Sequence, residues 1–260
     1  MGFVINTWIS CTVLLFKLAF LSHNDYNIKN LKNQKPKKNS IMIRLYLGGS
    51  FDPIHRAHLQ MVLSAHDTIH QKTADTVTVH LLPTAGNPFK NTPTSHAHRI
   101  AMLKLAITPL IKKGMNISID ERELSLIPPI YTIDTIRQLK STYPDDRLIF
   151  IIGGDSLANL HQWKAYDELI YQVKLWAFDR VDTTPADETV ATKCTTNLDE
   201  FLANDHTIYL DHTPIMNISS SQIRTLIADG RTKLAAPLMD ECVLAYICKE
   251  GLYQNPKNML

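Results

Sequence analysis

The feature that most constrains this chain is an alternation, from Ile43 onward, of short apolar runs with longer segments of helical periodicity. The apolar runs are rich in β-branched and aromatic residues and predict strands over residues 44–47, 76–82, 116–119, 148–152, 174–178 and 207–209. Helices are predicted over residues 59–70, 98–111, 132–141, 220–228 and 241–249. Strands that alternate with helices indicate a parallel sheet with helices on both faces. We therefore predict a single, doubly wound α/β domain that binds ligands beyond the carboxyl ends of its strands.

Composition narrows the class of protein. Of the 260 residues, 45% are hydrophobic, which is enough for one substantial core. The formal net charge is only +2, so the chain lacks the basic field that binds nucleic acid. The four cysteines form no CxxC pair, and we expect reduced thiols in a cytoplasmic protein and assign no metal ligand. Residues 181–205 show no persistent period and are predicted to form a surface excursion rather than a strand.

The amino-terminal segment differs from the rest of the chain. Residues 3–21 are mostly apolar, and residues 29–38 are rich in Lys and Asn. The apolar stretch is marginal in length for a membrane span, contains Lys17, and lacks the basic start and cleavage site of a secretory signal. We expect residues 1–41 to be a non-native or disordered extension, Met42 to be the natural start, and the domain to span residues 42–260. A membrane anchor is the alternative; N-terminal sequencing of the native protein tests the start, and fractionation tests the anchor.

The most informative segment is LYLGGSFDPIHRAHL, residues 45–59, in which a buried strand runs into two glycines, an Asp-Pro turn and a helix. Gly48 and Gly49 would permit backbone torsions closed to other residues and a close approach of phosphate groups. His55 and His58 are three apart, so within a helix they would share one face near an amino terminus that favours negative charge. Each feature alone is common in turns, whereas their combination at the ligand edge of a sheet indicates phosphate binding.

A second segment, NISSSQIR at residues 217–224, precedes a helical stretch. Ser219 can cap that helix, which is the ordinary role of a serine in this position. In the alternative interpretation, the amides around Ser220 and Ser221 and the guanidinium of Arg224 bind phosphate groups. The presence of the histidine segment favours phosphate binding, and a cap at Ser219 is compatible with it.

Together the two segments resemble the nucleotidyltransferase superfamily, whose first motif is a Gly-Gly strand end followed by two histidines and whose last reads ISSTxIR. Four further stretches resemble the bacterial nicotinate-nucleotide adenylyltransferases: LLPTAGNPFK (81–90), ERELSLIPPIYTIDTI (121–136), FIIGGDSLANLHQW (150–163) and VLAYICKEGLY (243–253). The resemblance covers nearly all of residues 43–253, in family order. It implies a Rossmann-like fold and the Mg²⁺-assisted transfer of AMP from ATP to nicotinate mononucleotide in NAD biosynthesis, with release of pyrophosphate.

The resemblance also implies roles for individual residues. The catalytic residues would be His55, His58 and Arg224. The ATP site would comprise Gly48, Gly49, Ser50, Phe51, His58, Asp155, Ile218, Ser219, Ser220 and Arg224. The mononucleotide site would comprise Ser50, Thr84, Lys90, Tyr131, Thr132 and Trp163. Structural alternatives stay open, because Asp155 could be a helix N-cap, Lys90 a solvated cation, and Trp163 a core aromatic residue.

The chain departs from the family pattern in places, which leaves rival functions open. Ala57 replaces a common Gly, Asn87 and Phe89 replace a Pro and a His in the 81–90 loop, and Ile130 replaces a Ser before Tyr131. One rival keeps the chemistry but uses nicotinamide mononucleotide or phosphopantetheine as the acceptor, and another is an ATP-binding regulator without turnover. The expected partners are the two small-molecule substrates, with no nucleic acid or membrane and with an oligomer left open.

Overall fold

Seven parallel strands form one sheet in the order β3-β2-β1-β4-β5-β7-β6. They are β1 (Met42–Gly49), β2 (Thr76–Pro83), β3 (Ile117–Ile119), β4 (Arg147–Gly153), β5 (Lys174–Phe178), β6 (Cys194–Thr195) and β7 (Ile208–Asp211). The chain runs outward from β1 to β3 and then returns to β4 on the other side of β1, so the strand order reverses between β1 and β4. The prediction of a doubly wound α/β sheet is confirmed, and the ligand crevice of such a sheet lies at this reversal.

This computed structural model describes residues 41–85, 94–178, 187–203 and 208–255. These residues form one compact unit. The expectations for the extension over residues 1–40 and for Asn87, Phe89 and Lys90 lie outside the described residues and stay predictions. No helix in the described part of the chain is long and apolar enough to cross a bilayer.

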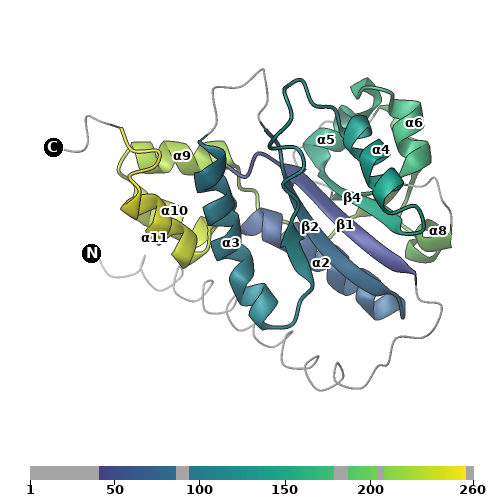
Figure 1. Cartoon of the computed structure of the whole chain (residues 1–260), viewed down its shortest axis with the longest axis horizontal. Coiled ribbons are helices and arrows are strands. Elements are labelled where there is room, and N and C mark those ends of the chain that lie inside the picture. Colours follow the sequence, from purple (N-terminus) through teal and green to yellow (C-terminus); the bar gives the residue numbers. More distant parts are fainter. Residues whose placement is uncertain (1–40, 86–93, 179–186, 204–207, 256–260) are drawn as a thin grey trace, which may run out of the picture. The chain divides into compact units, whose positions relative to one another are not determined.

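Helices and short 3-10 turns connect the strands. They are α2 (Arg56–Lys72), α3 (His96–Lys112), α4 (Thr132–Thr142), α5 (Gly154–Ala158), η1 (Leu160–Gln162), α6 (Tyr166–Gln172), α7 (Glu188–Ala191), α8 (Leu198–Ala203), α9 (Ser220–Ala228), α10 (Thr232–Ala235), η2 (Ala236–Leu238) and α11 (Glu241–Lys249). In Figure 1, α4, α5 and α6 lie together on one side of β1 and β4, whereas α3 lies with α9, α10 and α11 on the other side.

The two faces of the sheet form separate hydrophobic clusters. Ile43, Leu45 and Leu47 of β1 pack with buried residues of α2, α3, α9 and α11. Tyr46 points to the other face, where it packs with residues of α4 such as Ile136. Successive side chains of a strand point to opposite faces, and both faces here are covered, so β1 carries buried apolar side chains on both faces.

The prediction of a surface excursion over residues 181–205 was wrong in its described part. This part forms α7, β6 and α8, and β6 is the edge strand of the sheet, paired with β7. Val190 and Phe201 are fully buried and fix the two short helices to the core. Elements of four to six residues are too short for an apolar period to repeat, which is why the sequence pattern did not indicate them.

Candidate functional site

The glycine pair forms the end of β1, but the prediction that these glycines adopt backbone torsions closed to other residues was wrong. Gly48 and Gly49 belong to the strand, and neither has a positive φ. A side-chain carbon at Gly48 would meet nothing within 4 Å, whereas one at Gly49 would lie 3.3 Å from the Phe51 ring. Phe51 itself takes the left-handed conformation, with φ 48°. The unusual backbone conformation of this turn therefore lies at Phe51 and not at the glycines. Gly48 is exposed and has no side chain, so a ligand can approach its backbone.

The two histidines lie at the start of α2, as the spacing predicted. His55 is the N-cap of α2, and His58 is its third residue. The rings of His55 and His58 stack with their centroids 3.6 Å apart. The rings of His58 and Phe51 meet edge to face, with their centroids 5.0 Å apart. His55 is only 4% exposed, whereas His58 is half-buried. We name residues 50–58 the histidine loop; in it, His58 is the more accessible imidazole.

The contact between the two histidines also sets the proton position on His58. The backbone N–H of His55 donates to Nδ1 of His58 at 3.3 Å. A neutral imidazole whose Nδ1 accepts a hydrogen bond carries its proton on Nε2. The histidine loop thus fixes His58 as an Nε2–H donor without needing it to be charged.

Helix α9 brings Arg224 to the same loop. The guanidinium donates from Nη1 to the backbone carbonyl of Asp52 at 2.6 Å and from Nη2 to Oγ of Ser221 at 3.2 Å. Ser220 Oγ donates to the carbonyl of Pro53 at 2.9 Å. The second segment therefore contacts the histidine loop directly, and the two motifs lie together. Two of the five guanidinium donors are used in these bonds, so Arg224 keeps donors for an anion.

The other predicted ATP residues of this segment are held by the fold itself. Ser219 caps α9 by accepting a hydrogen bond from Gln222 N at 3.1 Å, which confirms the capping interpretation. Ile218 is 2% exposed, and its N–H donates to Met216 O.

Asp155 lies beside the strand reversal, just after β4. It is in the first turn of α5, whose N-cap is Gly153, so the N-cap alternative for Asp155 was wrong. Its side chain is exposed. The carboxylate and the histidine loop thus follow the two neighbouring strands β4 and β1, where a doubly wound sheet binds a nucleotide.

The predicted mononucleotide residues fall into two groups. Ser50 and Thr84 lie at the ends of β1 and β2, and Thr84 N donates to Gly49 O at 3.0 Å. Tyr131 is the N-cap of α4, Thr132 its first residue, and Trp163 follows η1. The Nζ atom of Lys164 lies 4.1 Å from the centre of the Tyr131 ring, so the Trp163 segment adjoins the start of α4.

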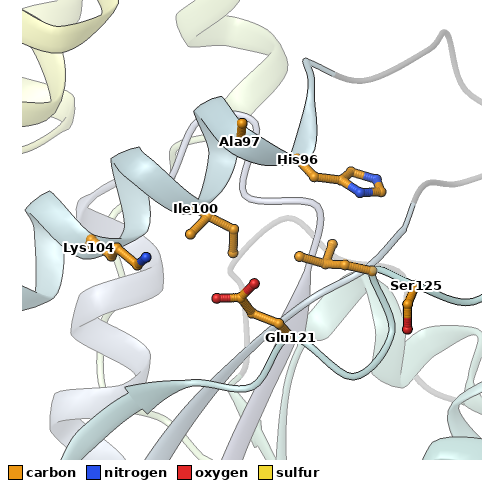
Figure 2. A pocket seen from close by; sticks show the side chains of 7 residues that line it. His96, Ala97, Ile100, Lys104, Glu121 and Ser125 are labelled. Carbon is orange, nitrogen blue, oxygen red and sulfur yellow. The ribbon is translucent and has the colours of Figure 1, made fainter.

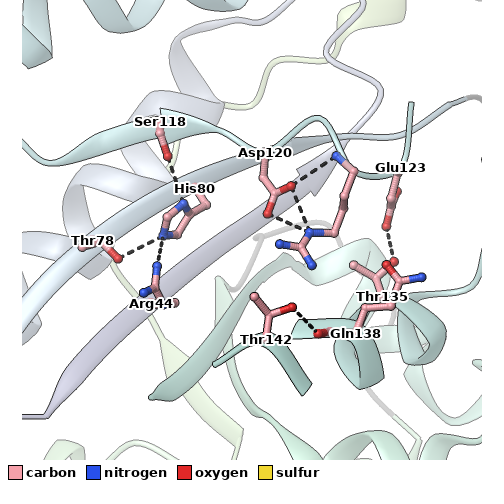
Figure 3. Close-up of polar contacts among 10 residues, drawn as sticks. Arg44, Thr78, His80, Ser118, Asp120, Glu123, Thr135, Gln138 and Thr142 are labelled. Carbon is pink, nitrogen blue, oxygen red and sulfur yellow. Dashed lines mark hydrogen bonds and ion pairs between the residues drawn. The ribbon is translucent and has the colours of Figure 1, made fainter. Parts of the chain in front are cut away.

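A buried polar pair, not predicted from the sequence, holds the segment before α4 (Figure 3). Thr135 Oγ1 donates to Oε1 of Glu123 at 2.6 Å, and both residues are buried. Burial raises the pKa of the Glu123 carboxyl, and the Thr135 bond partly opposes that rise. Nearby, Arg122 forms an ion pair with Asp120 at 2.8 Å. The Thr135 bond fixes Glu123 against the helix that begins at Thr132, and the ion pair lies within the segment before it.

Asp52, expected only to form a turn, is the most connected residue of the histidine loop. Its Oδ2 accepts from Thr94 N at 3.1 Å, and its Oδ1 accepts from the Tyr253 hydroxyl at 2.6 Å. Arg99, which is fully buried, donates to Ser50 O at 2.6 Å and to Thr94 O at 3.1 Å. Burial lowers the pKa of Arg99, and the Asp52 carboxylate opposes that shift. Three distant segments therefore hold the loop in place.

An open pocket of about 390 Å³ lies between α3 and the segment after β3 (Figure 2). Its lining residues are His96, Ala97, Ile100, Lys104, Glu121, Leu124 and Ser125. His96 Nε2 contacts the carbonyl of Ala85 at 3.1 Å at the rim. None of the predicted site residues lines this pocket, so the chemistry is not assigned to it.

Comparison with known proteins agrees with this arrangement. A family model described as cytidylyltransferase-like matches residues 46–226. A relative from Pseudomonas fluorescens, named "Probable nicotinate-nucleotide adenylyltransferase", is 31% identical over 81% of this chain and 96% of its own length. A relative from Aeromonas salmonicida with the same name is 35% identical over 80% of this chain and 95% of its own length.

A solved structure adds agreement in the fold. Plasmodium falciparum nicotinic acid mononucleotide adenylyltransferase complexed with NaAD has a TM-score of 0.63 at 22% identity and covers 82% of this chain and 97% of that chain. The histidine loop and α9 meet beside the strand reversal, and the relatives match this chain over most of their length. The chain therefore belongs to the nicotinate-nucleotide adenylyltransferase family of cytidylyltransferase-like proteins.

Proposed function

We propose that the chain transfers AMP from ATP to nicotinate mononucleotide, giving deamido-NAD and pyrophosphate in NAD biosynthesis. The observation that carries this proposal is the junction of Arg224 with the histidine loop beside the strand reversal. In this reaction a phosphate oxygen of the mononucleotide attacks the α-phosphorus of ATP. The bond from that phosphorus to the bridging oxygen breaks, and pyrophosphate leaves with the electron pair. The attacking phosphate is already an anion, so no general base is required.

The protein's part in such a reaction is to position the phosphates and to stabilise charge. His58 offers an Nε2–H donor at the start of α2, and Arg224 offers its remaining guanidinium donors from α9. Charge builds on the leaving pyrophosphate, where both groups would act. We propose Gly48, exposed at the end of β1, as the place where the triphosphate approaches the backbone, and Asp155 as the partner of the adenosine ribose.

The residues present suit a metal that arrives with ATP. Nucleotidyltransferases of this family generally use a divalent metal, and we propose Mg²⁺. In the described part of the chain, no three His, Cys, Asp or Glu side chains gather into a metal-binding group. Both carboxylate oxygens of Asp52 already accept hydrogen bonds. Mg²⁺ commonly relies on substrate phosphates and water with few protein ligands, so the ion would enter with the triphosphate as part of the substrate.

Selection of the nicotinate form would take place at the start of α4. The backbone amides of a helix amino terminus favour a carboxylate, and Tyr131 presents an aromatic ring that is 39% exposed. Lys164 adds a cation beside that ring, although its 3.3 Å contact with Asp134 offsets part of the charge. A nicotinamide group is neutral and gains less from both features. These residues support a preference for the carboxylate substrate.

Pyrophosphate release tests the proposal directly. The full chain with ATP and Mg²⁺ should release pyrophosphate with nicotinate mononucleotide and more slowly with nicotinamide mononucleotide. Pyrophosphate release with phosphopantetheine and with neither mononucleotide would show that the chain uses a different acceptor. Tight binding of ATP without pyrophosphate release would show that the chain is an ATP-binding regulator. The cytoplasmic location expected from the cysteines stays a prediction; Cys194, Cys242 and Cys248 are free thiols.

A further inference from the structure

The last described segment of the chain reaches the histidine loop. Tyr253 follows α11, and its hydroxyl donates to Oδ1 of Asp52 at 2.6 Å across 201 positions of the sequence. Asp52 is 6% exposed, so this bond forms away from bulk water. A hydrogen bond to a buried carboxylate is among the stronger kinds in proteins. The carboxyl-terminal segment thus contributes directly to the geometry of the loop.

Asp52 joins Tyr253 to the residues expected to meet ATP. Its carbonyl accepts from Arg224, and it lies three positions before His55. Any shift of the Asp52 carboxylate would therefore move both the acceptor of the Arg224 guanidinium and the entry to α2. Burial, and then the bond to Asp52, raise the pKa of Tyr253, so the phenol keeps its proton and its role as donor.

The backbone conformation near both ends of this contact also indicates that the contact matters for the site. In the described part of the chain, the non-glycine residues with positive φ are Phe51, Ala165 and Tyr253. Phe51 immediately precedes Asp52, and Tyr253 has φ 63°. Non-glycine residues persist in this region only where surrounding contacts hold them, commonly at functional sites. The hydrogen bond joins Tyr253, which is one such residue, to Asp52, which directly follows Phe51, another.

We propose that Tyr253 is a positioning residue for adenylyl transfer: by holding Asp52, it fixes the histidine loop and Arg224 in the arrangement that the transition state requires. This inference rests on the proposed function. Tyr253 touches Asp52 rather than the expected substrate groups, so its loss should lower kcat more than it alters KM for either substrate.

The chain offers a matched control for Tyr253. Tyr246 is another phenol of the carboxyl-terminal region, and its hydroxyl contacts Nδ1 of His98 at 2.8 Å, which joins α11 to α3. Tyr246→Phe removes one hydrogen bond of the same carboxyl-terminal region without touching Asp52. Both Phe variants should fold, with Tm lowered by roughly 2–8 °C for the loss of one hydrogen bond. A purely structural role would give the two variants the same kinetic effect.

The experiment is steady-state pyrophosphate release by the full chain and its variants. Tyr253→Phe should lower kcat on the order of tenfold with KM within about twofold, and Tyr246→Phe should keep kcat within about twofold. Asp52→Asn should lower kcat by a similar factor, and adding Tyr253→Phe to that variant should lower kcat little further.

Three results would overturn the inference: unchanged kcat in Tyr253→Phe, equal losses of kcat in both Phe variants, or a full further loss of kcat when Tyr253→Phe is added to Asp52→Asn. If Tyr253→Phe does not fold, unchanged kcat in Asp52→Asn would overturn it. A wild-type chain inactive with every mononucleotide would instead refute the proposed function and, with it, this inference.

Discussion

Replacing Thr135 with Val should destabilise the protein by leaving the buried Glu123 carboxyl without its donor. The hydroxyl and carboxyl oxygens lie 2.6 Å apart, and the residues are 1% and 4% exposed, so water cannot readily replace the bond. Val has almost the shape of Thr and leaves no large cavity. An acceptor left unpaired in this way costs about 1–3 kcal/mol. We therefore expect the free energy of unfolding to fall by about 2 kcal/mol at neutral pH.

The effect should depend on pH in a defined direction. Burial raises the folded-state pKa of Glu123 above its ordinary value, so the folded protein holds the proton more tightly than the unfolded chain. This contribution to stability is fully present below the unfolded pKa, about 4.3, and is lost as pH rises through the folded pKa. The Thr135 bond favours the ionised carboxylate. Its removal should extend the loss to higher pH, so Thr135→Val should be most destabilising on the alkaline side of this titration.

Urea unfolding followed by circular dichroism at several pH values measures the change. Thr142→Val is the matched control, because Thr142 lies in the same helix but donates to the Gln138 carbonyl at an exposed position (Figure 3). It should change stability by no more than about 0.5 kcal/mol. Glu123→Gln should remove the pH dependence, since an amide does not titrate. Equal losses in Thr135→Val and Thr142→Val would refute the reasoning.

Three further predictions concern charge. His55→Ala should lower turnover by roughly 100-fold or more in pyrophosphate release, as for a lost charge-stabilising donor, and unchanged turnover would refute the catalytic role that the family resemblance implies for His55. Lys164→Met should lower the preference for nicotinate over nicotinamide mononucleotide by about threefold at low salt, in line with an exposed cation, and an equal preference in both proteins would exclude Lys164 from selection. Burial, and then Arg44, lower the pKa of His80 to about 4, so the folded protein should lose stability as pH falls from 6.5 through 4. His80→Gln should flatten this acid limb in urea unfolding, and an unchanged limb would assign it to other groups.

The longer elements could be predicted because each repeats its pattern several times. The β5 strand and helices α9 and α11 have the predicted bounds, and the other predicted elements differ by a few residues at their ends. The missed elements are short: α5, η1, α6, α7, β6, α8, α10 and η2. Within seven residues or fewer a helical period barely repeats, so tertiary contacts such as the burial of Phe201 decide the structure there.

The site was predictable where local sequence carries the chemistry. The placement of His55 and His58 at the start of a helix followed from their spacing, and the Ser219 cap followed from residue type. The supports of the loop were not predictable in this way. Tyr253 is the last residue of one of the stretches that resemble the family, and Arg99 lies within a predicted helix. Their contacts with Asp52 and Ser50 join positions far apart in the chain, which no local period can indicate.

The supports also explain why the histidine loop cannot be understood from its own sequence. Phe51 adopts a conformation that an aromatic residue disfavours by about 1–3 kcal/mol, and no hydrogen bond within the Asp-Pro turn compensates it in the described structure. The compensating bonds come from Arg99, Tyr253 and Arg224, which lie on α3, after α11 and on α9. The loop that carries the stacked imidazoles is therefore held by α3, α9 and the segment after α11 as well as by its own sequence. Substitution of a residue that never touches a substrate can accordingly change turnover if that residue holds the histidine loop. Loss of a hydrogen bond between α3 and α11 that does not reach the loop, such as the bond between His98 and Tyr246, should change only stability.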